Sequence, residues 1–290
     1  MVKTYGEVYL RIKKALRGAG IEAAELEGRE IVAAAAGKTV EDFLRDRTMY
    51  ASEAVEEKAE DMLRRRLEGE PIGYVLGQWE FMGLTFKLTR DVLIPRTDTE
   101  TLASRALDLA RSEGAKRLLD VCCGCGCIGI SVAKYVAGLQ VWMTDISDAA
   151  LAVARFNARE LNVLARVNCM RLDALKTPPR LLKDFDIICC NPPYIMSGTI
   201  PQLDASVRDY EPHLALDGGQ DGLDFYRAIA PGYFGALRPG GHILFEVGIG
   251  QANDVAEIMT GCGYSVTEIL KDSANIDRVV VGTRNKEDKR

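Results

Sequence analysis

The strongest indication of a fold lies at residues 118–126, which read Leu118-Leu119-Asp120-Val121-Cys122-Cys123-Gly124-Cys125-Gly126. They combine an apolar strand, an acid, and a loop of small residues that opens a helix. Such a loop lets the backbone approach a ligand at the carboxyl end of a strand, where open parallel sheets bind nucleotides. The segment therefore predicts a ligand site on an α/β fold.

Strands and helices alternate around this loop, which is the pattern of a parallel sheet covered by helices. We predict strands at 117–121, 140–144, 166–171, 185–190, 242–247, 264–270 and 278–281. We predict helices at 98–112, 127–136, 148–161, 223–237 and 251–259. The last two strands are joined by too few residues for a parallel crossover, so they should pair antiparallel.

The chain before residue 70 has a helical pattern instead. Apolar residues recur at helical spacing from Tyr5 to Leu16, and Ser52 is a plausible N-cap for a charged helix that runs to Leu67. The other expected elements are helices at 22–36 and 39–45, short strands at 79–82 and 84–89, and an apolar run at 92–94.

Composition narrows the class of protein. The 290 residues are 47% hydrophobic, so a sizeable core can be buried, and the net charge of −5 argues against a dedicated nucleic-acid binder. No run approaches the roughly 18 apolar residues of a membrane span, and the N-terminus has no signal-peptide core. We therefore expect a soluble, cytoplasmic protein that does not bind membranes.

Asp145 and Asp120 indicate which cofactor the loop binds. Asp145 ends the next strand, where an acid can accept hydrogen bonds from both ribose hydroxyls. Gly124, Gly126 and Gly129 formally fit the pattern of a dinucleotide enzyme. However, Asp120 would repel a pyrophosphate, whereas it would attract the sulfonium and ammonium groups of S-adenosylmethionine. S-adenosylmethionine is thus the expected cofactor.

The most specific run of residues is Asn191-Pro192-Pro193-Tyr194, which follows the buried strand at 185–190. The prolines lack backbone N–H groups, so this turn presents carbonyls. With the Asn191 side-chain carbonyl, they form two acceptors for the hydrogens of one NH₂ group. Tyr194 adds a flat face for a planar group. The alternative is a proline-stiffened turn with a structural Asn.

Methyl transfer to a planar nitrogen needs such acceptors. The lone pair of an amide nitrogen is delocalised, and accepting both of its hydrogens raises the electron density on nitrogen and directs it at the methyl group. The exocyclic amine of adenine could be held in the same way. The four residues alone therefore leave protein and nucleic-acid substrates open.

The cysteines invite a metal interpretation. Cys122, Cys123, Cys125 and Cys127 lie together, but four thiolates on one short turn are poorly placed to converge on one ion, and the sequence has no second Cys-x-x-Cys pair. We expect no metal and read them as small residues in a tight loop. They should be reduced in the cytoplasm, although the cluster could make activity sensitive to oxidation.

Over nearly its whole length the sequence resembles the PrmC/HemK family, the glutamine methyltransferases that modify peptide chain release factors. Besides the loop and Asn191–Tyr194, the shared motifs are Pro71–Gly77, Glu80–Leu84, Val92–Arg96 with Thr99 and Glu100, Thr144–Ser147, Tyr210–Pro212, Ala215–Leu223, Gly240–Gly241, Glu246–Gly248 and Asp277–Val280. General adenine methyltransferases share only the loop and the four catalytic residues, so the other motifs make the match specific.

The resemblance implies a helical domain at 1–74 that docks the release factor and a β-hairpin linker at 75–96. It also implies a seven-stranded Rossmann-like methyltransferase domain at 97–290. The substrate would be the glutamine of the Gly-Gly-Gln motif of release factors, methylated at the side-chain amide nitrogen, N5. A ribosomal-protein glutamine methyltransferase is the nearest alternative, and a DNA or RNA adenine N6-methyltransferase is another.

The family's site residues map onto this sequence as three groups. Catalysis would fall to Asn191, Pro192, Pro193 and Tyr194. Cofactor binding would involve Asp120, Cys122, Cys123, Gly124, Cys125, Gly126, Asp145, Ile146, Asp173, Ala174 and Asn191. Substrate binding would involve Asn191–Tyr194, Arg96 and Glu100.

Two positions depart from the family pattern. Cys122 stands where the family has the first glycine of its loop, and a left-handed backbone would be costly for cysteine there. Thr97 replaces the proline that usually follows the linker arginine, so the chain there should be less rigid.

Overall fold

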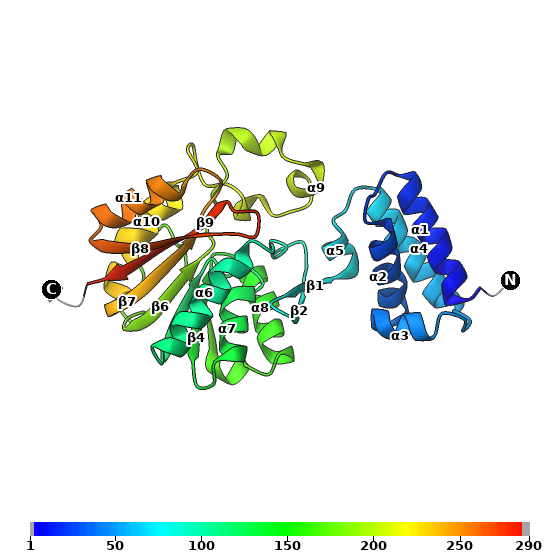
Figure 1. Ribbon diagram of the computed structural model, residues 1–290, viewed down its shortest axis with the longest axis horizontal. Coiled ribbons are helices and arrows are strands. Elements are labelled where there is room, and N and C mark those ends of the chain that lie inside the picture. The colour runs from blue at the N-terminus through cyan, green and yellow to red at the C-terminus, as the bar shows by residue number, and fades with distance from the viewer. Residues whose placement is uncertain (1–2, 286–290) are drawn as a thin grey trace. The chain divides into compact units, whose positions relative to one another are not determined.

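The computed structural model describes residues 3–285, which fall into two compact units (Figure 1). One comprises the N-terminal chain as far as Gln78 together with Asp204–Tyr210. The other comprises Trp79–Leu203 and the chain from Glu211 onward. No helix in the described part of the chain is long and apolar enough to cross a membrane.

The N-terminal unit is helical, with α1 (Tyr5–Gly18), α2 (Ala24–Ala36), α3 (Val40–Arg45), α4 (Glu53–Leu67), α5 (Ile72–Leu76) and α9 (Ala205–Arg208). Two of its longer helices begin at strong N-caps. Thr4 and Glu7 form a capping box on α1, and the Ser52 side chain accepts from the Val55 N–H at the start of α4, as predicted. The apolar face of α1 that the spacing predicts is buried in the core of this unit.

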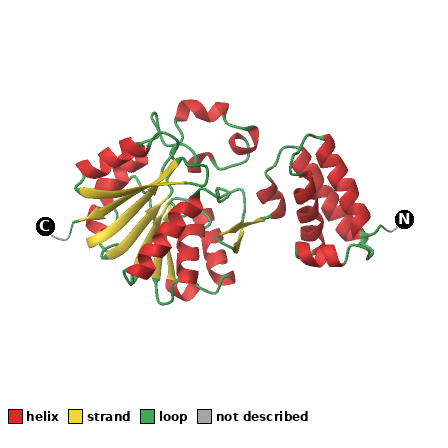
Figure 2. Ribbon diagram, viewed as in Figure 1, coloured by secondary structure: helices red, strands yellow, loops and turns green. Residues whose placement is uncertain are grey.

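The second unit contains a seven-stranded sheet with the order β5-β4-β3-β6-β7-β9-β8 (Figure 2). The strands are β3 (Arg117–Val121), β4 (Gln140–Asp145), β5 (Val167–Arg171), β6 (Phe185–Cys190), β7 (Leu237–Glu246), β8 (Tyr264–Lys271) and β9 (Asp277–Arg284). β3 to β7 pair parallel, whereas β9 pairs antiparallel with both β7 and β8. The Rossmann-like fold and the antiparallel final pair are thereby confirmed.

Helices lie on both faces of this sheet (Figure 2). They are α6 (Thr99–Ser112), α7 (Cys127–Tyr135), α8 (Asp148–Glu160), α10 (Asp224–Tyr233) and α11 (Ala252–Gly261). A two-stranded sheet of β1 (Gln78–Phe81) and β2 (Leu84–Lys87) precedes α6, at the position of the expected hairpin. Strand order reverses between β3 and β6, so the carboxyl ends of β3, β4 and β6 flank the crevice where such sheets bind ligands.

One strand and three short helices differ from the sequence-based prediction. β7 begins at Leu237 rather than at residue 242. The additional residues include Pro239, Gly240 and Gly241, which occupy a register shift opposite Phe185–Ile187, where a strand tolerates proline and glycine. Short helices at Ser197–Gln202, Ala205–Arg208 and His213–Ala215 were not predicted, because each is too short to show a periodic pattern.

Candidate active site

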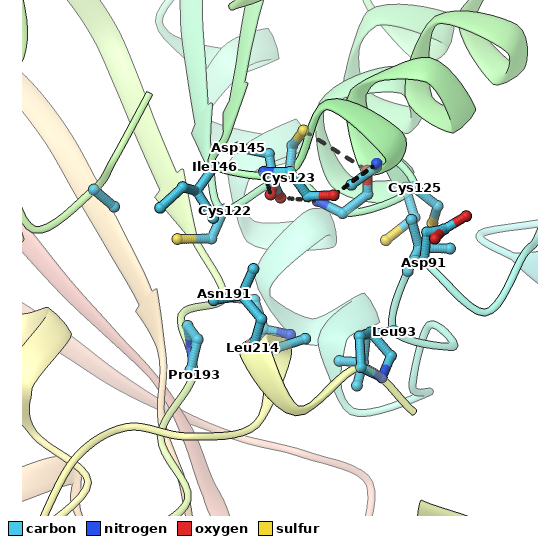
Figure 3. Close-up of a pocket in the computed structure, with 18 of the residues that line it drawn as sticks. Asp91, Leu93, Cys122, Cys123, Cys125, Asp145, Ile146, Asn191, Pro193 and Leu214 are labelled. Carbon is cyan, nitrogen blue, oxygen red and sulfur yellow. Dashed lines mark hydrogen bonds between the residues drawn. The ribbon is translucent and has the colours of Figure 1, made fainter. Parts of the chain in front are cut away.

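The loops that follow β3, β4 and β6 surround one cavity of about 310 Å³. The strands end in register, because Val121 pairs with Thr144 on one side and with Cys190 on the other. In Figure 3, Asn191 lies between Cys122 and Cys123 on one side and Pro193 and Leu214 on the other. The segments singled out for the cofactor and for catalysis therefore meet at one site.

The loop after β3 turns through left-handed backbone at three positions. Cys122, Gly124 and Gly126 have φ angles of +58°, +53° and +83°. A Cβ on Gly124 would point into open space, whereas a Cβ on Gly126 would lie 2.7 Å from Cδ1 of Ile130. Gly124 thus leaves room for a ligand beside the backbone, and Gly126 is required for the packing of α7 under the loop.

Cys122 retains the left-handed conformation despite its side chain, at a steric cost of roughly 1–2 kcal/mol. We expect Cys122→Gly to raise the free energy of unfolding by about 0.5–1 kcal/mol, because glycine removes most of this cost but loses some packing. Thermal unfolding of the two proteins measures the difference. Cys123→Gly is the matched control and should destabilise, since Cys123 is buried and lacks a positive φ. A lower melting temperature for Cys122→Gly would contradict the prediction.

The Asp145 side chain is held in place by hydrogen bonds from the backbone of two neighbouring loops. Its carboxylate accepts from the Gly124 N–H at 2.9 Å and from the Ser147 N–H at 3.0 Å. Burial raises its pKa, and the hydrogen bonds from Ser147 and Gly124 oppose that shift. A carboxylate has about four acceptor positions, so Asp145 can still accept from hydroxyl groups of a ligand.

Asp120 lies behind the loop rather than in the cavity wall. It is fully buried, and its Oδ2 accepts from the Gly129 N–H of α7 at 2.9 Å, while Oδ1 has no hydrogen-bond partner. Burial raises the pKa of Asp120 to about 7, with the Gly129 hydrogen bond opposing and Asp145 adding to the shift. Its direct contact is with the start of α7.

The turn after β6 presents Asn191 and Pro193 to the cavity. The Asn191 amide donates from Nδ2 to Oγ1 of Thr99 at 3.3 Å. The Tyr194 hydroxyl donates to Oε1 of Glu246 at 3.4 Å, and burial raises the pKa of Tyr194 well above its ordinary value. Pro192 is buried behind Asn191 and, like Tyr194, does not line the cavity.

The loop that precedes α10 packs closely against Tyr194. A Cβ on Gly218 would lie 2.7 Å from Cα of Tyr194, and one on Gly222 would lie 2.4 Å from its carbonyl oxygen. Gln251 joins this loop to the turn: its Nε2 donates to the carbonyls of Tyr194 at 3.1 Å and Gly222 at 3.3 Å, and its Oε1 accepts from the Gly248 N–H at 2.9 Å. Gln251 was not predicted.

We expect Gln251→Glu to lower turnover on the order of 10-fold, since a carboxylate cannot donate and would repel the carbonyls of Tyr194 and Gly222. Initial rates at saturating cofactor measure the effect. Glu257→Gln, on the exposed face of α11, is the control and should leave the rate unchanged. A Gln251→Glu enzyme as fast as the wild type would show that the turn holds its shape without this contact.

The two predicted substrate residues outside the turn behave differently. Arg96 lines the cavity and forms an ion pair with the buried Glu211. Glu100 does not line it; its Oε1 accepts from the Met82 N–H at 2.7 Å and so connects α6 to the turn between β1 and β2.

Of the predicted site residues, those that line the cavity are Arg96, Cys122, Cys123, Gly124, Cys125, Asp145, Ile146, Asp173, Ala174, Asn191 and Pro193. Those outside the wall are Glu100, Asp120, Gly126, Pro192 and Tyr194. Wall residues that were not predicted are Arg90, Asp91, Val92, Leu93, Pro95, Thr99, Cys127, Ile128, Ser147, Ala150, Leu172, Leu175, Pro212, Leu214, Ala215 and Phe225. Several of them belong to the family motifs at 92–96 and 210–212, but the sequence of these motifs did not indicate that they line the cavity.

The cysteines around the loop are free thiols. Burial raises the pKa values of Cys123, Cys189 and Cys190 far above the ordinary value, which makes them poor thiolate ligands. Among residues 3–285, no three His, Cys, Asp or Glu side chains are grouped so that they could hold a metal ion.

Comparison with known families agrees with this geometry. Residues 99–205 match the methyltransferase small domain, and residues 7–77 match the PrmC N-terminal domain. In solved structures, the fold is similar to that of the hMettl16 catalytic domain, with a TM-score of 0.55 at 16% identity over 81% of this chain and 82% of that one. It is also similar to a methyltransferase from Pyrococcus furiosus, with a TM-score of 0.52 at 18% identity over 78% and 99%.

Curated relatives are more similar in sequence. The chain is 43% identical over 224 residues to the release factor glutamine methyltransferase of Clostridium acetobutylicum, which covers 77% of this chain and 79% of the relative. It is 40% identical to that of Bradyrhizobium diazoefficiens, over 91% and 90% of the two chains. The similarity to the Caulobacter vibrioides enzyme extends over 98% of both chains at 33% identity.

Proposed function

Because the chain belongs to the family of release factor glutamine methyltransferases, we propose that it methylates the glutamine of the Gly-Gly-Gln motif in peptide chain release factors. The methyl group comes from S-adenosylmethionine, and the acceptor is the side-chain amide nitrogen, N5. The protein is thus a protein-glutamine N5-methyltransferase that acts in the cytoplasm.

The observation that carries this proposal is the position of Asn191. Its amide group lies in the same cavity as the Cys122–Cys125 loop and Asp145. A glutamine amide held at Asn191 would therefore lie beside whatever the loop binds. A turn with only a structural role would not need to place its amide side chain in a ligand cavity.

The residues of the turn act by positioning and electrostatics. Oδ1 of Asn191 and a backbone carbonyl of the proline pair would accept the two hydrogens of the glutamine NH₂, which raises electron density on nitrogen and fixes its direction. Tyr194 lies outside the cavity wall and would act by holding the turn, since its hydroxyl donates to Glu246 and its carbonyl accepts from Gln251. No strong general base is required, because the nitrogen becomes far more acidic once methylated and then releases its proton.

The wall of the cavity fits S-adenosylmethionine, which when bound supplies an electrophilic sulfonium methyl group. The open space beside Gly124 accommodates the ligand next to the backbone. Asp145 would accept from the ribose hydroxyls, and the Asp173–Ala174 turn would lie near the adenine. Ile146 offers the ribose and adenine an apolar contact. Asp120 would act from behind, by holding the start of α7.

The helical N-terminal domain, residues 1–74, would dock the release factor, with 75–96 as linker and 97–290 as methyltransferase domain. The match of residues 7–77 to the PrmC N-terminal domain supports this division. Asp204–Tyr210 packs within the same unit as the N-terminal helices. The Tyr210 hydroxyl donates there to the Glu68 carbonyl at 2.8 Å, so this segment belongs to the docking surface that we propose.

The test is incubation of the full-length protein with tritiated S-adenosylmethionine and separate release factor, ribosomal protein and DNA. We expect label on the release factor alone, and mass spectrometry should locate one methyl group on the glutamine of its Gly-Gly-Gln peptide. Label on the ribosomal protein or on adenine, with the release factor unlabelled, would refute the assignment.

A further inference from the structure

Two walls of the cavity come from segments that are far apart in the sequence. One is the loop after β3, from which Cys122–Cys125 line the cavity. The other is the chain after β2, from which Arg90–Leu93, Pro95 and Arg96 line it. Neither segment lies in a helix or a strand, so the position of each relative to the other depends on contacts with other parts of the chain.

A single buried side chain contacts both segments. Asn157 lies near the end of α8 and is 1% exposed. Its Nδ2 donates to the Cys125 carbonyl at 3.0 Å and to the Lys87 carbonyl at 3.1 Å, and its Oδ1 accepts from the Lys87 N–H at 2.8 Å. Lys87 is the last residue of β2, just before the wall segment that begins at Arg90. Asn157 therefore joins the Cys122–Cys125 loop to the end of the β1–β2 hairpin.

The direction of the Asn157 amide is fixed by its partners. A backbone N–H can only donate and a backbone carbonyl can only accept, so Oδ1 must face the Lys87 N–H and Nδ2 must face the Cys125 carbonyl. Both hydrogens of Nδ2 are used, one for each carbonyl. An aspartate of the same shape could only accept, and a leucine could neither donate nor accept. The position thus requires an amide and not merely a side chain of this size.

The helix that carries Asn157 begins at a third part of the cavity. Ser147, the N-cap of α8, lines the cavity, and its N–H donates to Asp145 at 3.0 Å. Asp145 also accepts from the N–H of Gly124, the residue before Cys125, at 2.9 Å. The loop after β3 is therefore held by two side chains, that of Asp145 before α8 and that of Asn157 within it.

We propose that Asn157 is a positioning residue that couples the Cys122–Cys125 loop to β2, so that a cofactor bound on the loop also orders the end of the hairpin. The ligand contacts the loop, the Cys125 carbonyl holds the Asn157 amide, and the amide holds both backbone groups of Lys87. Asn157 itself does not line the cavity. The inference rests on the cofactor proposed above but not on the identity of the methyl acceptor.

Amide hydrogen exchange of the wild-type protein, resolved by NMR, tests the coupling. The ligand is S-adenosylhomocysteine, the demethylated cofactor, which cannot react. Lys87 does not line the cavity, yet its N–H should exchange about 5-fold more slowly with saturating ligand, because local opening at Lys87 then disturbs a loop that the ligand holds.

The Met82 N–H is the matched control for this measurement. It lies in the turn of the same hairpin but donates to Oε1 of Glu100 at 2.7 Å, so its partner is on α6 and not on α8. Its exchange should slow less than that of Lys87. A ligand effect at Lys87 no larger than the effect at Met82 would overturn the inference.

Asn157→Asp separates coupling from simple support. The carboxylate can still accept from the Lys87 N–H but cannot donate to the Cys125 carbonyl. We expect the affinity for S-adenosylhomocysteine, measured by titration calorimetry, to fall about 10-fold, and the extra slowing at Lys87 to disappear. Phe156→Leu is the matched control: it removes the ring that lies 4.3 Å from Nζ of Lys87 but keeps the Asn157 amide, so its affinity should equal that of the wild type.

A purely structural role for Asn157 would give a different result. The melting temperature of Asn157→Asp would fall, while the affinity of the folded protein and the ligand effect at Lys87 stayed those of the wild type, and the inference would be wrong. If Asn157→Asp does not fold, the wild-type comparison of Lys87 with Met82 decides alone.

Failure of the proposed function is distinguishable from failure of this inference. A wild type that leaves the release-factor glutamine unmethylated would refute the proposed substrate without changing the binding and exchange results. A wild type that does not bind S-adenosylhomocysteine would refute the proposed cofactor, and the inference would fall with it.

Discussion

Asn191→Ala should nearly abolish methyl transfer while leaving cofactor affinity almost unchanged. The substitution removes the only side-chain acceptor that the turn after β6 places in the cavity wall, among the residues that the structure describes. Loss of one preorganised electrostatic contact of this kind costs about 10²–10³ in rate. Single-turnover transfer to a release factor, followed by mass spectrometry of the Gly-Gly-Gln peptide, gives the rate and the site of modification.

Two variants control this experiment. Asn191→Asp keeps an acceptor and should retain more activity than Asn191→Ala, although its charge changes the field at the sulfonium. Asn253→Ala removes an exposed asparagine from α11 and should behave as the wild type. The proposed mechanism would be wrong if Asn191→Ala methylated glutamine as fast as the wild type.

The sequence predicted the part of the site that lies at strand ends. Regular strands place their carboxyl ends at one edge of a parallel sheet, so the positions of residues 122–126, Asp145 and Asn191 followed once the strands were known. Ser52 and the antiparallel final pair were predictable for a similar reason. Each depends on a local rule, an N-cap or a short connection, that does not require the three-dimensional structure.

The rest of the cavity wall follows no such rule. Residues 90–96 and 212–215 have no regular period, and they reach the cavity only through the path of the chain in space. Asp204–Tyr210 likewise packs with helices far away in the sequence. Gln251 looks like an ordinary residue before a helix. Its role appears only when the carbonyls of Tyr194 and Gly222 are found beside it.

Asp120 shows a different limit of sequence reasoning. Its position in the motif is clear, but side chains alternate across a strand, and the sequence does not say which face carries the ligand. Leu119 and Val121 pack into the core cluster that includes Phe245. Asp120 therefore points to the opposite face, where it meets the Gly129 N–H of α7. Its contact with a cofactor stays a prediction.

Asp145→Ala should weaken S-adenosylmethionine binding by about 1.5–3 kcal/mol, the usual contribution of hydrogen bonds to a charged group. The residue is well placed for this role, because its carboxylate borders the cavity and is held by the N–H groups of Gly124 and Ser147. Titration calorimetry measures the affinity, and thermal unfolding checks that the fold survives.

The same carboxylate also shapes the loop, so the two effects must be separated. Asp145→Asn keeps an oxygen that can accept from one backbone N–H but loses the charge. If the ribose contact dominates, Asp145→Asn should lose nearly as much cofactor affinity as Asp145→Ala while losing less stability, because it keeps one of the two backbone hydrogen bonds. If support of the Gly124 turn dominates, affinity and stability should instead fall together, and mainly in Asp145→Ala. An unchanged affinity in both variants would mean that a residue other than Asp145 holds the ribose.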